Sequence, residues 1–196
     1  MYLYHYFDIT REPFLSLSDL SKEEAKIIRD NHNRLQAEKE GRDYNENEID
    51  YCGWENRHLM ENNMREKFAA KGGKIHRKYP YYMILRNDDI SDEAGFYNGN
   101  HIKIPVEEFD MSVVSFTYGD SAQIHDPGTY SDRPYWNNVY TFAEILEIIK
   151  EYGWITKVDN WNWCIPCYIE AQLWSDEPIN KYRLRAFSNI KNEVIL

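Results

Sequence analysis

A histidine near the beginning of the chain and a glutamate near its end are the residues whose types and positions best suit chemistry. His5 lies in residues 4–6 (YHY), inside residues 2–8, whose alternation predicts a β-strand. Glu170 lies among apolar neighbours in residues 168–172 (YIEAQ). A carboxylate in mid-strand is unfavourable unless it is paired or used. His5 and Glu170 are therefore the candidate catalytic residues.

Both residues also have a structural interpretation, which the sequence leaves open. His5 shares its strand face with Leu3 and Phe7, as a core histidine with satisfied ring nitrogens would. Glu170 would then form a salt bridge with Arg183 or Arg185 at a sheet edge. The two interpretations differ in one geometric respect, which is whether His5 and Glu170 meet in one cleft.

The turn after the apolar run 113–118 supplies three candidate substrate-binding residues, Tyr118, Asp120 and Ser121. The loop that follows, residues 119–135, is long enough to close over a cleft. The string GDS at 119–121 resembles the nucleophile block of GDS-type esterases, but the D-x-x-H block that supplies their base is absent. We therefore expect a strand-ending turn in which Asp120 and Ser121 bond their own backbone.

A short cationic run lies between the two halves of the chain. Lys71, Lys74 and Arg77 fall within residues 69–80 (AAKGGKIHRKYP). Such a cluster can bind a pyrophosphate or a nucleic-acid strand, so these three residues are candidate substrate ligands. The alternative is a helix that ends at Gly72, with cations that complement its dipole.

The cysteines indicate neither a redox pair nor a metal site. Residues 163–167 (WCIPC) match the thioredoxin-type string, whose chemistry needs the first cysteine at a helix N-terminus. The residues that follow alternate like a strand, so we predict that Cys164 and Cys167 are ordinary thiols. With Cys52 the count is three, which is odd and too small for a disulfide framework. A reduced, cytoplasmic setting without a bound metal is expected.

Composition limits the classes of partner. The chain has 23 Lys and Arg against 33 Asp and Glu, a net charge of −10, which argues against duplex DNA. Residues 79–196 carry most of the negative charge, with 18 acidic and 9 basic residues, and they would suit a basic protein partner. No apolar run approaches the length of a membrane span, and residues 1–14 lack the features of a signal peptide.

The expected elements define an α+β fold. Ser21 with Glu24, and Thr141 with Glu144, form capping boxes that begin helices, and a third helix is expected over about 48–70. Strands are expected at residues 2–8, 81–86, 101–104, 113–118 and 168–174. This order predicts an antiparallel or mixed sheet with an N-terminal strand, a two-helix insertion and one further helix, in a single domain over 1–196.

A histidine on an early strand and a glutamate on a late one resemble the arrangement of ADP-ribosyltransferases, in the branch that reads Y-H-x-T and A-E-x-x-V. The resemblance implies that His5 holds the ribose of NAD and that Glu170 stabilises positive charge as nicotinamide leaves. It also implies NAD as cofactor and nucleic acid as a candidate acceptor. The chain departs from the pattern at Phe7, Ala171 and Gln172.

A second resemblance covers nearly the whole chain. The strings YHYFD, PFLSLSDL, KGGK, VSFTYGDS and YIEAQLW resemble an uncharacterised family of small bacterial cytoplasmic proteins. That family implies no activity. The alternative to an ADP-ribosyltransferase-like enzyme is therefore a non-catalytic protein-binding module. Such a module would regulate or inhibit its partner through an acidic, aromatic-rich surface.

Overall fold

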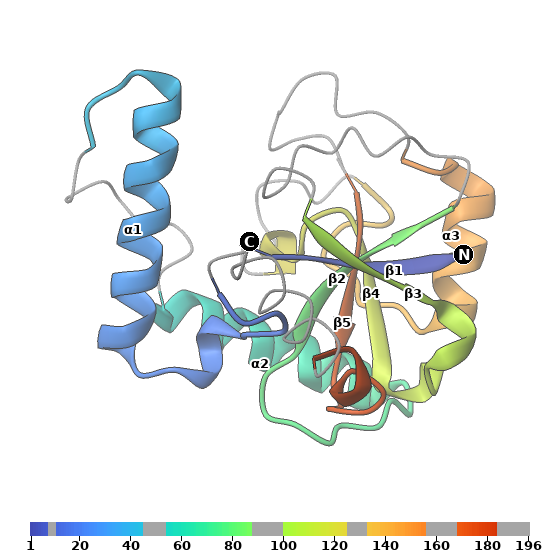
Figure 1. The fold of residues 1–196 in the computed structure, drawn as a ribbon. Helices are drawn as coiled ribbons and strands as arrows, with labels where there is room; N and C mark the ends of the chain where they lie inside the picture. Colours follow the sequence, from blue (N-terminus) through green and yellow to red (C-terminus); the bar gives the residue numbers. More distant parts are fainter. Residues whose placement is uncertain (8–10, 45–53, 88–99, 125–132, 156–167, 184–196) are drawn as a thin grey trace.

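The computed structural model describes residues 1–7, 11–44, 54–87, 100–124, 133–155 and 168–183. A five-stranded antiparallel sheet forms its centre, in the order β3-β1-β2-β5-β4 (Figure 1). The strands are β1 (Tyr2–Tyr6), β2 (Tyr81–Arg86), β3 (His101–Pro105), β4 (Val114–Tyr118) and β5 (Ile169–Leu173). The α+β class expected from the sequence is confirmed.

The α-helices α1 (Lys22–Glu40), α2 (Trp54–Ala70) and α3 (Phe142–Tyr152) accompany the sheet. Both predicted capping boxes are present, one at Ser21 and one at Thr141. The N-terminal strand is followed by two helices and, later, by one more, as expected. Residues 45–53, where the predicted second helix begins, lie outside the described residues.

The register divides the strand residues between two faces of the sheet. Leu85, Ile169 and Tyr118 are aligned across β2, β5 and β4, and α3 packs on β4. We call this side the α3 face. It carries the larger apolar cluster, to which α3 contributes the buried side chains of Ile145 and Ile149.

The opposite side, here called the α2 face, is covered in part by α2. Met60, Met64 and Phe68 of α2 pack in one cluster with Trp174, the residue that follows β5. Figure 1 shows that α1 projects from the sheet on the side away from α3. Within the described residues, no helix has the length and apolarity needed to cross a membrane.

A chain of hydrogen bonds runs along the α2 face beneath α2. Trp174 Nε1 donates to Ser115 Oγ at 2.8 Å, and Ser115 Oγ donates to Gln172 Oε1 at 2.8 Å. Gln172 Nε2 donates to Thr117 Oγ1 at 3.2 Å, and Thr117 Oγ1 donates to the Gly119 carbonyl at 2.7 Å. Buried polar groups are tolerated when they are bonded in this way. The chain therefore fixes the turn that follows β4.

Candidate functional site

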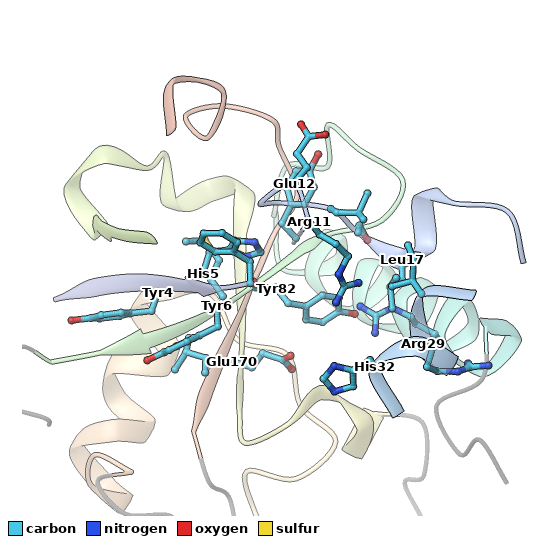
Figure 2. Close-up of a pocket in the computed structure, with 18 of the residues that line it drawn as sticks. Tyr4, His5, Tyr6, Arg11, Glu12, Leu17, Arg29, His32, Tyr82 and Glu170 are labelled. Atoms are coloured by element: carbon cyan, nitrogen blue, oxygen red, sulfur yellow. The ribbon is translucent and has the colours of Figure 1, made fainter. Parts of the chain in front are cut away.

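A cavity of about 330 Å³ lies between the sheet, the segment 11–17 and the helices α1 and α2 (Figure 2). Its lining is rich in tyrosine, arginine and histidine. Tyr82 comes from β2, Arg57 from α2 and His32 from α1. Glu170 of β5 also lines the cavity, so one of the two candidate catalytic residues faces a space that can hold a ligand.

Glu170 is buried at the wall of this cavity. Its Oε2 accepts a hydrogen bond from the Ser121 N–H at 2.7 Å. Burial raises the pKa of Glu170 to about 8, and the negative charge of Asp120 acts in the same direction. Near neutral pH the carboxyl group therefore keeps its proton, which is the state of a proton donor.

The turn after β4 holds a second carboxyl group beside Glu170. Asp120 Oδ1 accepts from the Ala122 N–H at 2.7 Å, and the Tyr168 hydroxyl donates to Asp120 Oδ2. Adjacent N–H groups of one turn thus bind the two carboxyl groups. Asp120 and Ser121 lie beside Glu170, and Asp120 bonds its own turn, but neither residue lines the cavity, so their role as substrate-binding residues stays a prediction.

A second network backs the cavity at Tyr82 and Arg57. The Tyr82 hydroxyl donates to Glu61 Oε1 at 2.8 Å, and Ser18 Oγ donates to the same atom at 2.8 Å. Arg57 Nε lies 3.2 Å from this oxygen, and its guanidinium group sits 4.6 Å above the Tyr82 ring. Glu61 is fully buried, and desolvation raises its pKa.

Sequence reasoning missed Glu61 and Tyr82. A signal for Glu61 exists, because it follows Met60 and precedes Met64 on the apolar side of α2. A buried acidic residue on such a face requires partners.

His5 has a structural role. Its Nε2 accepts from the Phe14 N–H at 2.8 Å, so the neutral ring carries its proton on Nδ1, which donates to the Tyr82 carbonyl at 3.0 Å. The ring stacks on Phe14 with centroids 4.1 Å apart. Burial lowers the pKa of His5 to about 4, which keeps the ring neutral. With both nitrogens bonded to the main chain, His5 cannot hold a ribose.

His5 and Glu170 both line the cavity, but they come from opposite faces of the sheet. Tyr4 of β1 is aligned with Ile84 of β2, and Ile84 with Glu170 of β5, so these three residues share the α2 face. His5 is the next residue along β1 and points to the other face, because side chains alternate along a strand. Figure 2 shows the His5 ring on one side of β1 and Glu170 on the other.

The cationic run does not reach the cavity. Each cation pairs with a different acidic residue: Lys71 with Glu144 at 2.9 Å, Lys74 with Asp110 at 3.3 Å, and Arg77 with Asp176 at 2.8 Å. Neither lysine nor Arg77 lines the cavity around Glu170. These three residues therefore join segments of the fold away from the cavity, and the structure gives no contact that links them to Glu170.

The remaining expectations have different outcomes. Tyr118 points to the α3 face and its hydroxyl donates to the Gly153 carbonyl at 3.0 Å, so it is not part of the cavity. Arg183 donates to the Phe14 carbonyl and the Tyr81 hydroxyl, at 2.8 and 2.6 Å, rather than pairing with Glu170. Arg185 lies outside the described residues.

The cysteine predictions stay untested, since Cys52, Cys164 and Cys167 lie outside the part of the chain that the structure describes. Among the described residues, no group of three or more His, Cys, Asp or Glu side chains is arranged to bind a metal ion.

Comparisons of the chain with models of protein families, with curated proteins and with solved structures found no match. The resemblances stated above therefore stay predictions, and the case for a function rests on the geometry of the cavity.

Proposed function

We propose that the protein is an enzyme that binds a small substrate in the cavity and that Glu170 is its general acid. One observation carries the proposal: a buried carboxyl group lines a cavity and has a pKa of about 8. A buried acid is unfavourable for folding, and carboxyl groups with such raised pKa values occur most often where a proton is transferred.

Cleavage or transfer at a glycosidic bond is the reaction class that suits this site. The Glu170 proton moves to the leaving group, the bond to the anomeric carbon breaks, and water or an acceptor hydroxyl attacks that carbon and loses its own proton to the solvent or to the Glu170 carboxylate. Asp120 is a positioning residue, because its charge favours the protonated form of Glu170. Tyr82 and Tyr168 line the cavity and offer aromatic faces to a sugar or base.

Transfer of ADP-ribose from NAD, the reaction that the sequence resemblance implies, is one form of this chemistry. In our proposal His5 has no contact with the substrate, since its ring nitrogens bind Phe14 and Tyr82. NAD, which has an N-glycosidic bond between nicotinamide and ribose, is the first substrate to test. Nucleosides and nucleotides are tested next.

The test measures, by chromatography, the release of nicotinamide or of a free base. Glu170→Gln should lower the rate at least 100-fold, whereas Glu147→Gln should leave it unchanged, because Glu147 is an exposed residue of α3. If protonated Glu170 is the general acid, the reaction rate should fall as pH rises above about 8, where Glu170 loses its proton. If the reaction instead needs the Glu170 carboxylate, the rate should rise over the same pH range. A rate that rises, or no turnover of any glycosidic substrate, would refute the proposal.

The protein-binding module remains the second candidate, favoured by one observation. Ile27 and Leu35 of α1 are 61% and 53% exposed, on the helix that projects from the body in Figure 1. Exposed apolar side chains on a projecting helix suit a protein partner. If this function holds, Ile27→Ser and Leu35→Ser should abolish binding of the partner while Glu170→Gln leaves it intact.

A further inference from the structure

We propose that residues 14–20 form a strap that opens and closes over the cavity as one unit while the sheet stays folded. Leu15, Ser16 and Leu17 line one wall of the cavity (Figure 2), and the chain continues from the strap into α1. The inference concerns access to the cavity. It needs the cavity as a ligand site, but it does not depend on the reaction proposed above.

Side chains from other elements hold the strap closed. Among the described residues, the main-chain hydrogen bonds of the strap are local. The Asp19 N–H donates to the Ser16 carbonyl at 3.1 Å, and the Leu20 N–H donates to the Leu17 carbonyl at 3.3 Å. A segment held in this way can leave its position without breaking the hydrogen bonds of the sheet.

The first attachment is at Phe14, and its backbone is strained. The Phe14 N–H donates to His5 Nε2 at 2.8 Å, and Arg183 donates to the Phe14 carbonyl at 2.8 Å. Phe14 has a φ of 59°, in the left-handed region that a bulky side chain enters at a cost. Opening the strap allows Phe14 to leave this conformation, so the closed form depends on contacts that outweigh the strain.

The second attachment is at Ser18, and it connects the strap to the cavity wall. Ser18 Oγ donates to Glu61 Oε1 at 2.8 Å, and the Tyr82 hydroxyl donates to the same oxygen at 2.8 Å. Arg57 Nε donates to Ser18 Oγ at 2.9 Å. Tyr82 and Arg57 both line the cavity. A ligand that contacts either side chain therefore acts on the groups that hold the strap, which couples occupation of the cavity to closure.

Two features of the closed strap favour opening. Ser16 is buried, and within the described part of the chain its hydroxyl group has no hydrogen-bond partner. Water would bond this hydroxyl in an open strap, which removes the cost of burying it. Leu15 is exposed, so closure gains little from burying its side chain. With the strain at Phe14, these costs bring the open and closed forms closer in free energy.

Native-state hydrogen exchange, followed by NMR, tests the strap in the unaltered protein. The Phe14 and Leu20 N–H groups should exchange at least 100-fold faster than the N–H groups of β2 and β5. Both should report one opening free energy that depends little on low concentrations of urea. Different opening free energies for Phe14 and Leu20, or exchange with the rate and urea dependence of the sheet, would overturn the proposal.

Two serine variants of the strap should act in opposite directions. Ser18→Ala removes the hydrogen bond to Glu61 and should speed exchange at the Phe14 and Leu20 N–H groups at least tenfold. Ser16→Ala removes a buried hydroxyl that has no partner in the described part of the closed form, and should slow exchange at both groups at least fivefold. Effects of the same sign, or an effect confined to one of the two groups, would refute the strap.

Ser112→Ala is the matched control. Ser112 Oγ donates to Asp110 Oδ1 at 2.6 Å, and neither residue belongs to the strap or lines the cavity. This variant should leave exchange in the strap unchanged. If Ser18→Ala fails to fold, the unaltered protein and Ser16→Ala still decide the matter. The measurements involve no turnover, so their failure would overturn the strap and leave the proposed reaction standing.

Discussion

Replacing Glu170 by glutamine should stabilise the protein at neutral pH, because the buried carboxyl group opposes folding once the unfolded chain has lost its proton. In the unfolded state the side chain titrates with a pKa of 4.5, and in the folded state with a pKa of about 8. Between these values the folded protein holds a proton that the unfolded chain releases. The free energy of unfolding therefore decreases as pH rises through this window.

The size of the effect follows from the two pKa values. Each pH unit within the window lowers the unfolding free energy by about 1.4 kcal/mol, which gives about 3 kcal/mol between pH 4.5 and pH 7. A glutamine keeps an oxygen that can accept from the Ser121 N–H, and it does not titrate. The variant should match the parent protein near pH 4.5 and exceed it by about 3 kcal/mol at pH 7.

Urea unfolding at several pH values measures this difference. Trp174 is fully buried, so its fluorescence should report the transition. Asp120→Asn provides a second check, because removing the Asp120 charge lowers the pKa of Glu170 and should make the gain from glutamine smaller. A difference between variant and parent that is the same at pH 5 and pH 7.5 would refute the reasoning. Lower stability of Glu170→Gln at both pH values would show that Glu170 is an ionised structural residue.

Three further predictions concern positions outside the proposed chemistry. His5→Phe keeps the stacking on Phe14 but removes two hydrogen bonds, and it should lower stability by about 3 kcal/mol at pH 7. That loss of stability should shrink toward pH 4. Between pH 6.5 and about 4, His5 of the unfolded chain binds a proton that folded His5 does not, so the parent protein loses stability as pH falls, whereas the variant does not. An equal loss at pH 4 and pH 7, measured by urea unfolding, would contradict this prediction. Thr141→Ala removes a helix cap and should lower stability by about 1 kcal/mol, so an unchanged urea midpoint would count against the cap. Cys164 and Cys167 should titrate as ordinary thiols; reversible oxidation of both with a depressed pKa would contradict that prediction.

The sequence alone determined the elements whose signals are local. Residues 81–86 form β2 within the predicted bounds, and Thr141 with Glu144 begins α3 as expected. Alternation and capping involve residues a few positions apart, so their physics is contained in short segments. Glu170 also became a candidate through local context, as a carboxylate among apolar strand neighbours.

Only the tertiary structure decided which side chains meet. β2 lies between β1 and β5, and its register aligns Tyr4, rather than His5, with Glu170. If β1 were shifted by one residue relative to β2, His5 instead of Tyr4 would share a face with Glu170. No pattern within β1 or β2 alone specifies the register between them. Thr117 and Gln172 alternate like solvent-facing residues, yet they are buried because α2 covers their face.

The cavity has the same origin. Arg11, Arg29 and Glu170 line one cavity, although more than 100 residues separate each arginine from Glu170 in the sequence. The cationic run at 71–78 looked more suitable because its charges are adjacent in sequence. In the fold those charges meet acidic partners from four separate segments, which hold Asp19, Asp110, Glu144 and Asp176. Local composition gives the charge of a segment, and only the packing of distant segments decides what that charge faces.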